Sequence, residues 1–216
     1  MELKKIQQRL NELGFGPLTT DGKSGPKTLA AIKAFQTSKG LTADGILGGK
    51  TTHALFPHTH TKGRLLSTAE IIGKYGKPGP ENLVLLTLPY PMRVSWDLKH
   101  TATKIQCHKF IAEPLKKALT EILDHYGIDA IKRLGIDLYG GVYNFRKMRG
   151  GNDWSRHSWG IAIDLDPIRN DLRMNHTTAQ FAKPEYQHMI DIFYNNGFVG
   201  LGPEKDYDWM HFQIGH

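Results

Sequence analysis

The residues that could do chemistry in this 216-residue chain lie in two short segments of its C-terminal half. Residues 155–164 read Ser-Arg-His-Ser-Trp-Gly-Ile-Ala-Ile-Asp, and residues 208–211 read Asp-Trp-Met-His. Imidazoles and carboxylates are good zinc ligands, and a catalytic zinc takes three of them and keeps one position for water. Zinc lowers the pKa of that water from about 16 to about 7. The residue types therefore predict a catalytic zinc site on His157, Asp164 and His211.

Asp208 lies three residues before His211 and is the candidate acid/base, able to take a proton from water and return it to a leaving amine. Residues three apart on a regular strand point to opposite faces, so the two can share a site only if the chain turns between them. Asp166 precedes a proline and is interpreted as a turn residue. It is the next candidate for the base.

Alternating residues after Gly160 indicate the strand that would position Asp164. One face carries aliphatic side chains, those of Ile161, Ile163 and Leu165. The other face carries Ala162, Asp164 and Asp166, and the small alanine leaves room for an ion. A second strand, punctuated by glycines, is predicted over residues 139–146, and a helix over 114–126 that Pro114 opens and Gly127 closes. This mixture indicates an α+β domain.

These segments resemble the metallopeptidase family of D-alanyl-D-alanine carboxypeptidases and L-alanyl-D-glutamate endopeptidases, which includes many bacteriophage endolysins. The family pattern Ser-x-His, two residues, Gly-x-Ala-x-Asp matches at Ser155, His157, Gly160, Ala162 and Asp164. Its acidic-x-x-His pattern matches at Asp208 and His211. The resemblance extends from about Tyr90 to Gln213 and implies one zinc ion per chain, bound by His157, Asp164 and His211.

The same resemblance implies that Asp208 is the general base. The family often has Glu at this position, and the endolysin branch also uses the shorter Asp. An upstream arginine of the family stabilises the oxyanion or binds a substrate carboxylate. Arg146 is the best match for that arginine and Arg149 the second.

The first 56 residues contain an internal repeat. Asp-Gly-Lys-Ser-Gly-Pro-Lys-Thr at 21–28 recurs as Asp-Gly-Ile-Leu-Gly-Gly-Lys-Thr at 44–51. In each copy an Asp-Gly turn leads into a helical pattern, and Pro26 suits a first helical position. The apolar stripes at helical spacing are Leu3, Ile6, Leu10 and Leu13, and then Leu29, Ile32 and Phe35. With a short third segment that ends at Ala54 and Leu55, they predict a three-helix unit.

This unit resembles the small peptidoglycan-binding module that accompanies many wall hydrolases. The resemblance covers residues 3–56 and rests on Gln7-Gln8-Arg9-Leu10, Leu13-Gly14-Phe15, Phe35-Gln36 and the two Asp-Gly turns. It implies binding of carbohydrate or stem peptide near those turns. A polar segment broken by Pro57 and Gly63 follows. The predicted domains are therefore a binding module at 1–56, a linker at 57–66 and a zinc metallopeptidase with an antiparallel sheet at 67–216.

Composition bears on other classes of protein: nucleic-acid binders, membrane proteins and cysteine peptidases. A formal net charge of +7 favours polyanionic partners, but the basic residues are scattered and form no nucleic-acid motif. No apolar run is long enough to span a bilayer. The single cysteine, Cys107, excludes a disulfide framework. His108 adjoins it, and adjacent side chains point apart, so a Cys-His dyad is excluded and Cys107 is interpreted as a buried hydrophobe.

We therefore predict a monomeric, zinc-dependent peptidoglycan peptidase whose partner is bacterial peptidoglycan and not nucleic acid. The charged N-terminus lacks an apolar stretch behind it and so is not a secretory signal. This fits a phage lysin made in the host cytoplasm that reaches the cell wall after the membrane is breached. We favour L-Ala–D-Glu endopeptidase activity, since modular lysins benefit from cutting stem peptides. The alternatives are a D-Ala–D-Ala carboxypeptidase and a wall-binding protein without catalysis.

Overall fold

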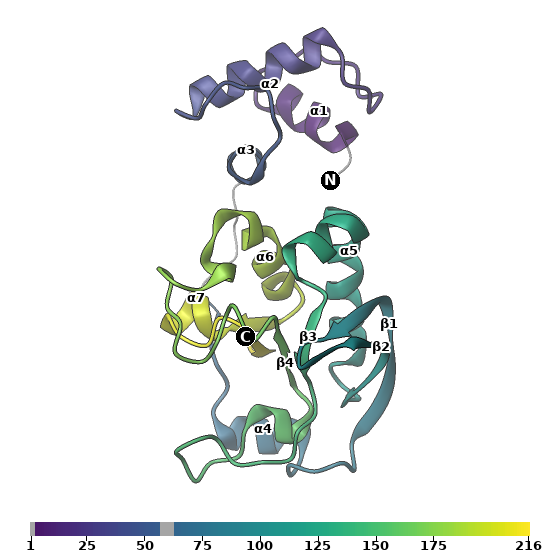
Figure 1. Ribbon diagram of the computed structural model, residues 1–216, viewed down its shortest axis with the longest axis vertical. Coiled ribbons are helices and arrows are strands. Elements are labelled where there is room, and N and C mark those ends of the chain that lie inside the picture. The colour runs from purple at the N-terminus through teal and green to yellow at the C-terminus, as the bar shows by residue number, and fades with distance from the viewer. Residues whose placement is uncertain (1–2, 57–62) are drawn as a thin grey trace. The chain divides into compact units, whose positions relative to one another are not determined.

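The computed structural model describes residues 3–56 and 63–216, which form two compact units, one helical and one built on a six-stranded sheet (Figure 1). Residues 57–62 of the predicted linker lie outside the described residues. Arg64 and Leu65, at the end of that linker, pair with the last residues of the chain: the Arg64 N–H donates to the His216 carbonyl, and Leu65 bridges Gly215. No helix within 3–56 or 63–216 is long and apolar enough to cross a bilayer.

The helical unit contains the three predicted helices, α1 (Leu3–Glu12), α2 (Pro26–Ser38) and α3 (Gly49–Leu55). Pro26 occupies the first turn of α2, as expected of a residue whose missing N–H would have no helical partner there. Apolar side chains from all three helices form one core, consisting of Ile6, Leu10, Ala31, Ile32, Phe35 and Leu55. The prediction is wrong for Leu29: its side chain is 41% exposed and lies outside this core.

A buried glutamine fixes each Asp-Gly loop of the repeat. The Gln7 amide nitrogen donates to Asp21 Oδ1 over 3.0 Å, and its oxygen accepts the Gly22 N–H over 2.8 Å. The second copy repeats these contacts at 2.8 Å each, with Gln36, Asp44 and Gly45. The amide nitrogen and the amide oxygen of each glutamine thus have partners inside the fold, as buried polar groups require. The sequence repeat is therefore a repeat of hydrogen bonds between a helix and the loop after it.

The second unit is α+β, as predicted. Its strands are β1 (Leu83–Val94), β2 (Asp97–His108), β3 (Leu138–Gly141), β4 (Ala162–Leu165), β5 (Phe198–Gly200) and β6 (His211–Ile214). Their order in the sheet is β2-β1-β3-β4-β6-β5. The sheet is mixed: β1 and β3 are parallel, and the remaining neighbours pair in the predicted antiparallel sense.

The helices that follow α3 in the chain are α4 (Thr68–Tyr75), α5 (Ala112–Leu134), α6 (Gln187–Asn195) and α7 (Leu201–Lys205), with three short 3-10 turns at Arg156–Trp159, Gln180–Ala182 and Pro184–Tyr186. α5 starts two residues before Pro114. The prediction that Gly127 ends this helix is wrong. Gly127 has a φ of 71° and produces a kink, after which the helix continues to Leu134. Gly135, also left-handed, closes the helix.

The predicted strand at 139–146 is only partly a strand. β3 stops at Gly141, whose φ of 126° turns the chain away from the sheet. The turn is held by the Val142 N–H, which donates to the Tyr139 hydroxyl over 3.0 Å. β4 matches its prediction, because Ile161, Ile163 and Leu165 are fully buried. Asp164, on the opposite face of β4, and the segment that follows β3 both lie at the candidate site.

Candidate metal centre

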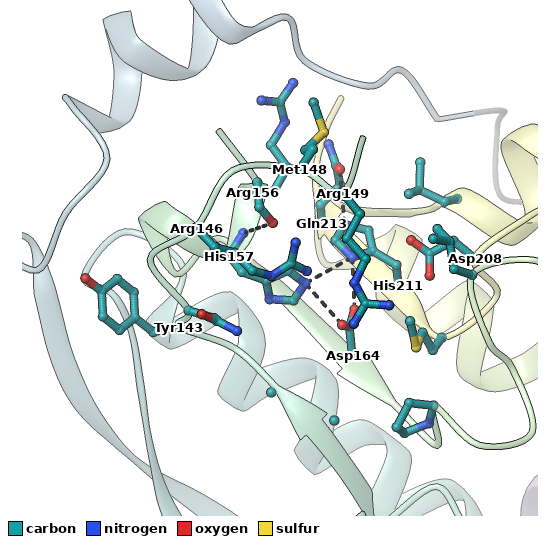
Figure 2. Close-up of a pocket in the computed structure, with 18 of the residues that line it drawn as sticks. Tyr143, Arg146, Met148, Arg149, Arg156, His157, Asp164, Asp208, His211 and Gln213 are labelled. Atoms are coloured by element: carbon teal, nitrogen blue, oxygen red, sulfur yellow. Dashed lines mark hydrogen bonds and ion pairs between the residues drawn. The ribbon is translucent and has the colours of Figure 1, made fainter. Parts of the chain in front are cut away.

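Three side chains from distant parts of the sequence converge in the second unit. His211 Nδ1 lies 2.9 Å from Asp164 Oδ1, and His157 Nε2 lies 3.2 Å from Asp164 Oδ2. The two imidazole nitrogens are 3.2 Å apart. Figure 2 shows the three side chains facing one another within one pocket. One ligand atom from each lies within 4.8 Å of the others, so a single ion could contact all three.

Neighbouring strands and a glycine turn bring these side chains together. Asp164 on β4 is paired directly with His211, the first residue of β6. His157 lies in the 3-10 turn that precedes β4, and this turn ends at Gly160. Gly160 has φ 66°, and a Cβ there would lie 2.8 Å from Leu83 Cδ2 and 3.1 Å from the His108 nitrogen. Only glycine satisfies both the left-handed backbone and the close packing.

The second nitrogen of each imidazole has an acceptor as its partner. His157 Nδ1 lies 2.8 Å from the Val142 carbonyl oxygen, and His211 Nε2 lies 3.1 Å from Gln213 Oε1. Each neutral ring can therefore donate its N–H outward and keep a lone pair on the nitrogen beside Asp164. In that form two lone pairs and a carboxylate converge, an arrangement that a cation stabilises. Two imidazoles and one carboxylate form a ligand set that fits zinc.

Electrostatics favour positive charge at the same point. Burial alone raises the pKa of Asp164, but the two imidazoles outweigh burial and hold that pKa well below its usual range. Burial likewise lowers the pKa of His211, while its hydrogen bond to Asp164 and the charge of that carboxylate bring the net pKa above its usual value. Asp164 is therefore ionised, and it attracts a proton or a metal ion to the imidazoles beside it.

Asp208 reaches the pocket because the chain turns before β6. Its φ is 54°, and its carbonyl accepts the His211 N–H over 3.0 Å, so the turn that the spacing requires is present. The side chain is 8% exposed, and its Oδ1 accepts no hydrogen bond from the described residues. Burial, assisted by the charge of Asp164, raises the pKa of Asp208. In Figure 2 its carboxylate lies on the side of His211 away from His157.

The pocket around these groups has a volume of about 960 Å³. Both candidate arginines line it. Arg146 is half-buried; its backbone N–H donates to Ser158 Oγ over 3.0 Å, and its guanidinium donates to the Lys147 carbonyl over 3.2 Å. Arg149 is exposed, on the loop after Arg146. In Figure 2 Arg146 lies on the His157 side of the site and Asp208 on the His211 side, and the choice between the two arginines stays a prediction.

Asp166 and Cys107 are not among the described residues that line the pocket. Asp166 leaves β4 with φ 45°, its Oδ2 lies 2.6 Å from an Arg169 nitrogen, and it is not among the described residues that line the pocket. The structure therefore makes it a buried ion-pair partner at a turn. Cys107 is fully buried, which raises its pKa to about 12. The adjacent His108 contacts the backbone, with Nε2 3.1 Å from the Tyr75 carbonyl oxygen.

The sequence motifs did not indicate the partners that orient the imidazoles. Gln213 could have been found, because it lies two residues after His211 on a strand and so shares its face. The Val142 carbonyl gives no sequence signal, since any residue supplies one. Trp96, which also lines the pocket, belongs to a turn far from the metal motifs.

Comparison with known proteins assigns a family to each part. Residues 2–55 match the family model described as a putative peptidoglycan binding domain, and residues 149–214 match the one described as D-alanyl-D-alanine carboxypeptidase. The second range includes the three candidate ligands and Asp208 but not Arg146. The modular architecture predicted from the motifs is thereby confirmed.

Two curated proteins are similar over shorter stretches. The chain is 40% identical over 83 residues to the putative OxPP cycle protein OpcA of Synechocystis sp., which covers 37% of this chain and 18% of that protein. It is 48% identical over 50 residues to an uncharacterized protein in the bpoA1 3' region of Kitasatospora aureofaciens, covering 23% of this chain and 42% of that protein. The chain thus spans less than half the length of either relative. No solved structure matches it.

Proposed function

We propose that this chain, which combines a peptidoglycan-binding domain with a D-alanyl-D-alanine carboxypeptidase-type domain, is a zinc-dependent peptidase that hydrolyses amide bonds in peptidoglycan stem peptides. The observation that carries the proposal is the convergence of His157, Asp164 and His211, with each imidazole oriented by an acceptor on its outer nitrogen. These three residues would hold the ion. When bound, zinc acts as a Lewis acid and lowers the pKa of a coordinated water to about 7.

Asp208 then has the role of acid/base. Burial raises the pKa of the Asp208 carboxyl above its usual value, and a carboxylate with a higher pKa is a stronger base. Asp208 accepts a proton from the attacking water as the water oxygen bonds to the peptide carbonyl carbon. It returns that proton to the amide nitrogen as the carbon–nitrogen bond breaks. Its buried, unpaired Oδ1 leaves one acceptor position for this exchange.

Arg146 supports the same reaction from the opposite wall of the pocket. Negative charge develops on the carbonyl oxygen when the water adds, and a fixed cation near that oxygen stabilises it. The substrate also carries carboxylates, which a guanidinium binds in bidentate fashion. Half-burial and the bond from its backbone to Ser158 restrict the position of Arg146 more than that of the exposed Arg149.

We place the cut at the L-Ala–D-Glu bond, as in a bacteriolytic endolysin, because cleavage there separates stem peptides from the glycan. A wall-binding module serves such an enzyme by holding it on an insoluble substrate. The D-Ala–D-Ala bond is the second candidate, favoured by the printed description of the matching family. A wall-binding protein without catalysis is the third.

Mass spectrometry of purified walls and soluble muropeptides after digestion tests the proposal. We expect products with a new amino group on D-Glu, complete loss of activity with a chelator, and recovery with zinc. A thiol-alkylating reagent should have no effect, because Cys107 is buried and its pKa is about 12. Release of D-Ala alone would select the carboxypeptidase. Activity that survives exhaustive chelation would contradict the proposal, and wall binding with no product would leave only the third candidate.

A further inference from the structure

Trp96 is a large exposed aromatic residue at the edge of the catalytic pocket. It lies in the turn between β1 and β2, is 69% exposed, and lines the pocket that contains the candidate metal ligands. Its ring lies 6.2 Å from that of Tyr139, at 45°. The Ser95 N–H donates to the Tyr139 carbonyl over 3.0 Å and fixes the turn to β3. The backbone of the turn is thus held against β3, and the indole lies beside the Tyr139 ring with most of its surface facing solvent.

Tyr139 supports the indole rigidly. Its ring also lines the pocket, and its hydroxyl accepts the Val142 N–H over 3.0 Å. A hydroxyl engaged in this way stops the ring from swinging aside. Rigid aromatic side chains lose little conformational entropy when a ligand binds, so they are effective contact surfaces. The two rings therefore form a preformed platform at one end of the pocket.

The sheet order gives the distance from this platform to the metal site. Trp96 follows β1, Asp164 lies on β4, and β3 lies between those strands. Neighbouring strands are about 4.8 Å apart, so two spacings separate the backbone at the end of β1 from that of β4 by about 10 Å across the sheet. Asp208 and His211 lie beyond β4 on the other side. The pocket therefore runs across the sheet from Trp96 at one end, past Asp164 at the metal site, to Asp208 at the other end.

This separation matches one part of peptidoglycan. The stem peptide begins with L-Ala, which is joined through a lactyl group to the ring of N-acetylmuramic acid. If the L-Ala–D-Glu bond lies at the metal site, about two residue lengths, or roughly 7 Å, separate that bond from the edge of the sugar ring. The ring itself then covers the platform. With the D-Ala–D-Ala bond at the site, about five residue lengths, or roughly 17 Å, would intervene, and the sugar would lie beyond the platform.

We propose that Trp96, backed by Tyr139, is a stacking platform for the muramic acid ring, so that the enzyme prefers glycan-linked stem peptides to free ones. The C–H groups on one face of a pyranose are apolar and carry slight positive charge, which complements the negative face of an indole. Stacking would cover apolar surface that the free protein leaves in water. The inference rests on the proposed function and specifies the substrate on the amino side of the cut.

Two soluble substrates test the platform: the disaccharide tetrapeptide, and the lactyl tetrapeptide that lacks both sugars. Wild type should cleave the first with a higher kcat/KM. In Trp96→Ala that preference should fall by about tenfold, a typical loss for an aromatic anchor, while cleavage of the lactyl peptide is unchanged. The loss should appear in KM and not in kcat, because the sugar does not change during the reaction. Trp96→Phe should recover part of the preference.

Ile168→Ala is the matched control, since Ile168 is 68% exposed and is not among the described residues that line the pocket. It should leave both substrates unaffected. Equal cleavage of the two substrates by wild type, or an equal loss on both in Trp96→Ala, would overturn the platform and leave the proposed peptidase intact. If wild type cleaves neither substrate, the assignment of the cut to the L-Ala–D-Glu bond fails instead. Calorimetric binding of the same two compounds to the wild-type and Trp96→Ala proteins would then decide the platform.

Discussion

His157 Nε2 and His211 Nδ1 lie 3.2 Å apart beside Asp164, while the outer nitrogen of each ring lies within hydrogen-bond distance of its own acceptor. When both rings are neutral and donate outward, the two inner nitrogens present lone pairs that a cation beside Asp164 stabilises. The outer acceptors, the Val142 carbonyl and the Gln213 amide, therefore contribute to metal binding without touching the ion.

The Gln213 contact gives the first prediction. Gln213→Leu removes the acceptor that orients His211 while keeping an apolar group in a buried position. Zinc affinity should fall about 10- to 100-fold, the usual effect of losing such a partner. Gln213→Glu retains an acceptor and should bind zinc close to wild type. Competition with a chromophoric chelator measures both, and wild-type affinity in the leucine variant would contradict the orienting role.

The metal ligands themselves give the second prediction. Elemental analysis should find about one zinc per chain, and this content should drop sharply in His157→Ala and in His211→Ala. His176→Ala is the control, because His176 is exposed and pairs with Asp206 outside the site. If both ligand variants kept full zinc content, the assignment of the site would be wrong.

The division of labour between the domains gives the third prediction. A protein comprising residues 63–216 keeps the whole sheet and every candidate site residue. It should hydrolyse small soluble peptides at the rate of the full chain and bind intact walls more weakly. Pulldown on purified walls, with soluble-peptide assays alongside, measures both properties. Equal wall binding by the truncated and full proteins would contradict a binding role for the N-terminal module.

Much of this account could be predicted from local patterns. Alternation after Gly160 predicted the buried aliphatic face of β4, and the repeat predicted the N-terminal helices. Ala162 and Asp166, on the opposite face, are buried as well. Those signals are local, since period two and period 3.6 record which side chains face a core. The ligand set came from motif resemblance, and the structure places its members together.

Other features depend on contacts that sequence spacing does not record. The predicted strand at 139–146 stops at Gly141, because a bond between Tyr139 and Val142 draws the chain out of the sheet. Leu29 fits the helical stripe but faces outward. Gly127 has the sequence signature of a helix end, yet the helix continues after a kink. The first case has a visible cause, a backbone-to-side-chain hydrogen bond three residues apart that outweighs the local strand preference.

Acid stability gives the fourth prediction, at the start of α4. Glu70 bonds to Arg64 and to the Ser67 backbone N–H, each over 2.8 Å, and the Arg64 contact is the main cause that lowers the pKa of Glu70 to about 2. Because the folded pKa is below the unfolded value, this carboxylate stabilises the fold above about pH 4.5 and loses its effect as the pH falls toward 2.

Glu70→Gln should therefore lower the Tm at pH 7, and the difference from wild type should shrink as the pH falls from about 5 to about 2. Thermal unfolding followed by circular dichroism across that range measures the difference. A gap between the two proteins that stays constant with pH would show that the charge of Glu70 has no part in stability. Glu81→Gln, at an exposed acidic residue outside α4, is the control.

The central claim is that Asp208 performs proton transfer without binding the metal, and Asp208→Asn tests it most directly. The substitution keeps the shape of the side chain and removes its ability to accept a proton. Zinc content and Tm should stay near wild type, whereas kcat should fall by about 10²- to 10⁴-fold, the usual contribution of such a group. His211→Ala should instead lose zinc and activity together. An Asp208→Asn protein that kept its zinc and most of its peptidase rate would contradict the account.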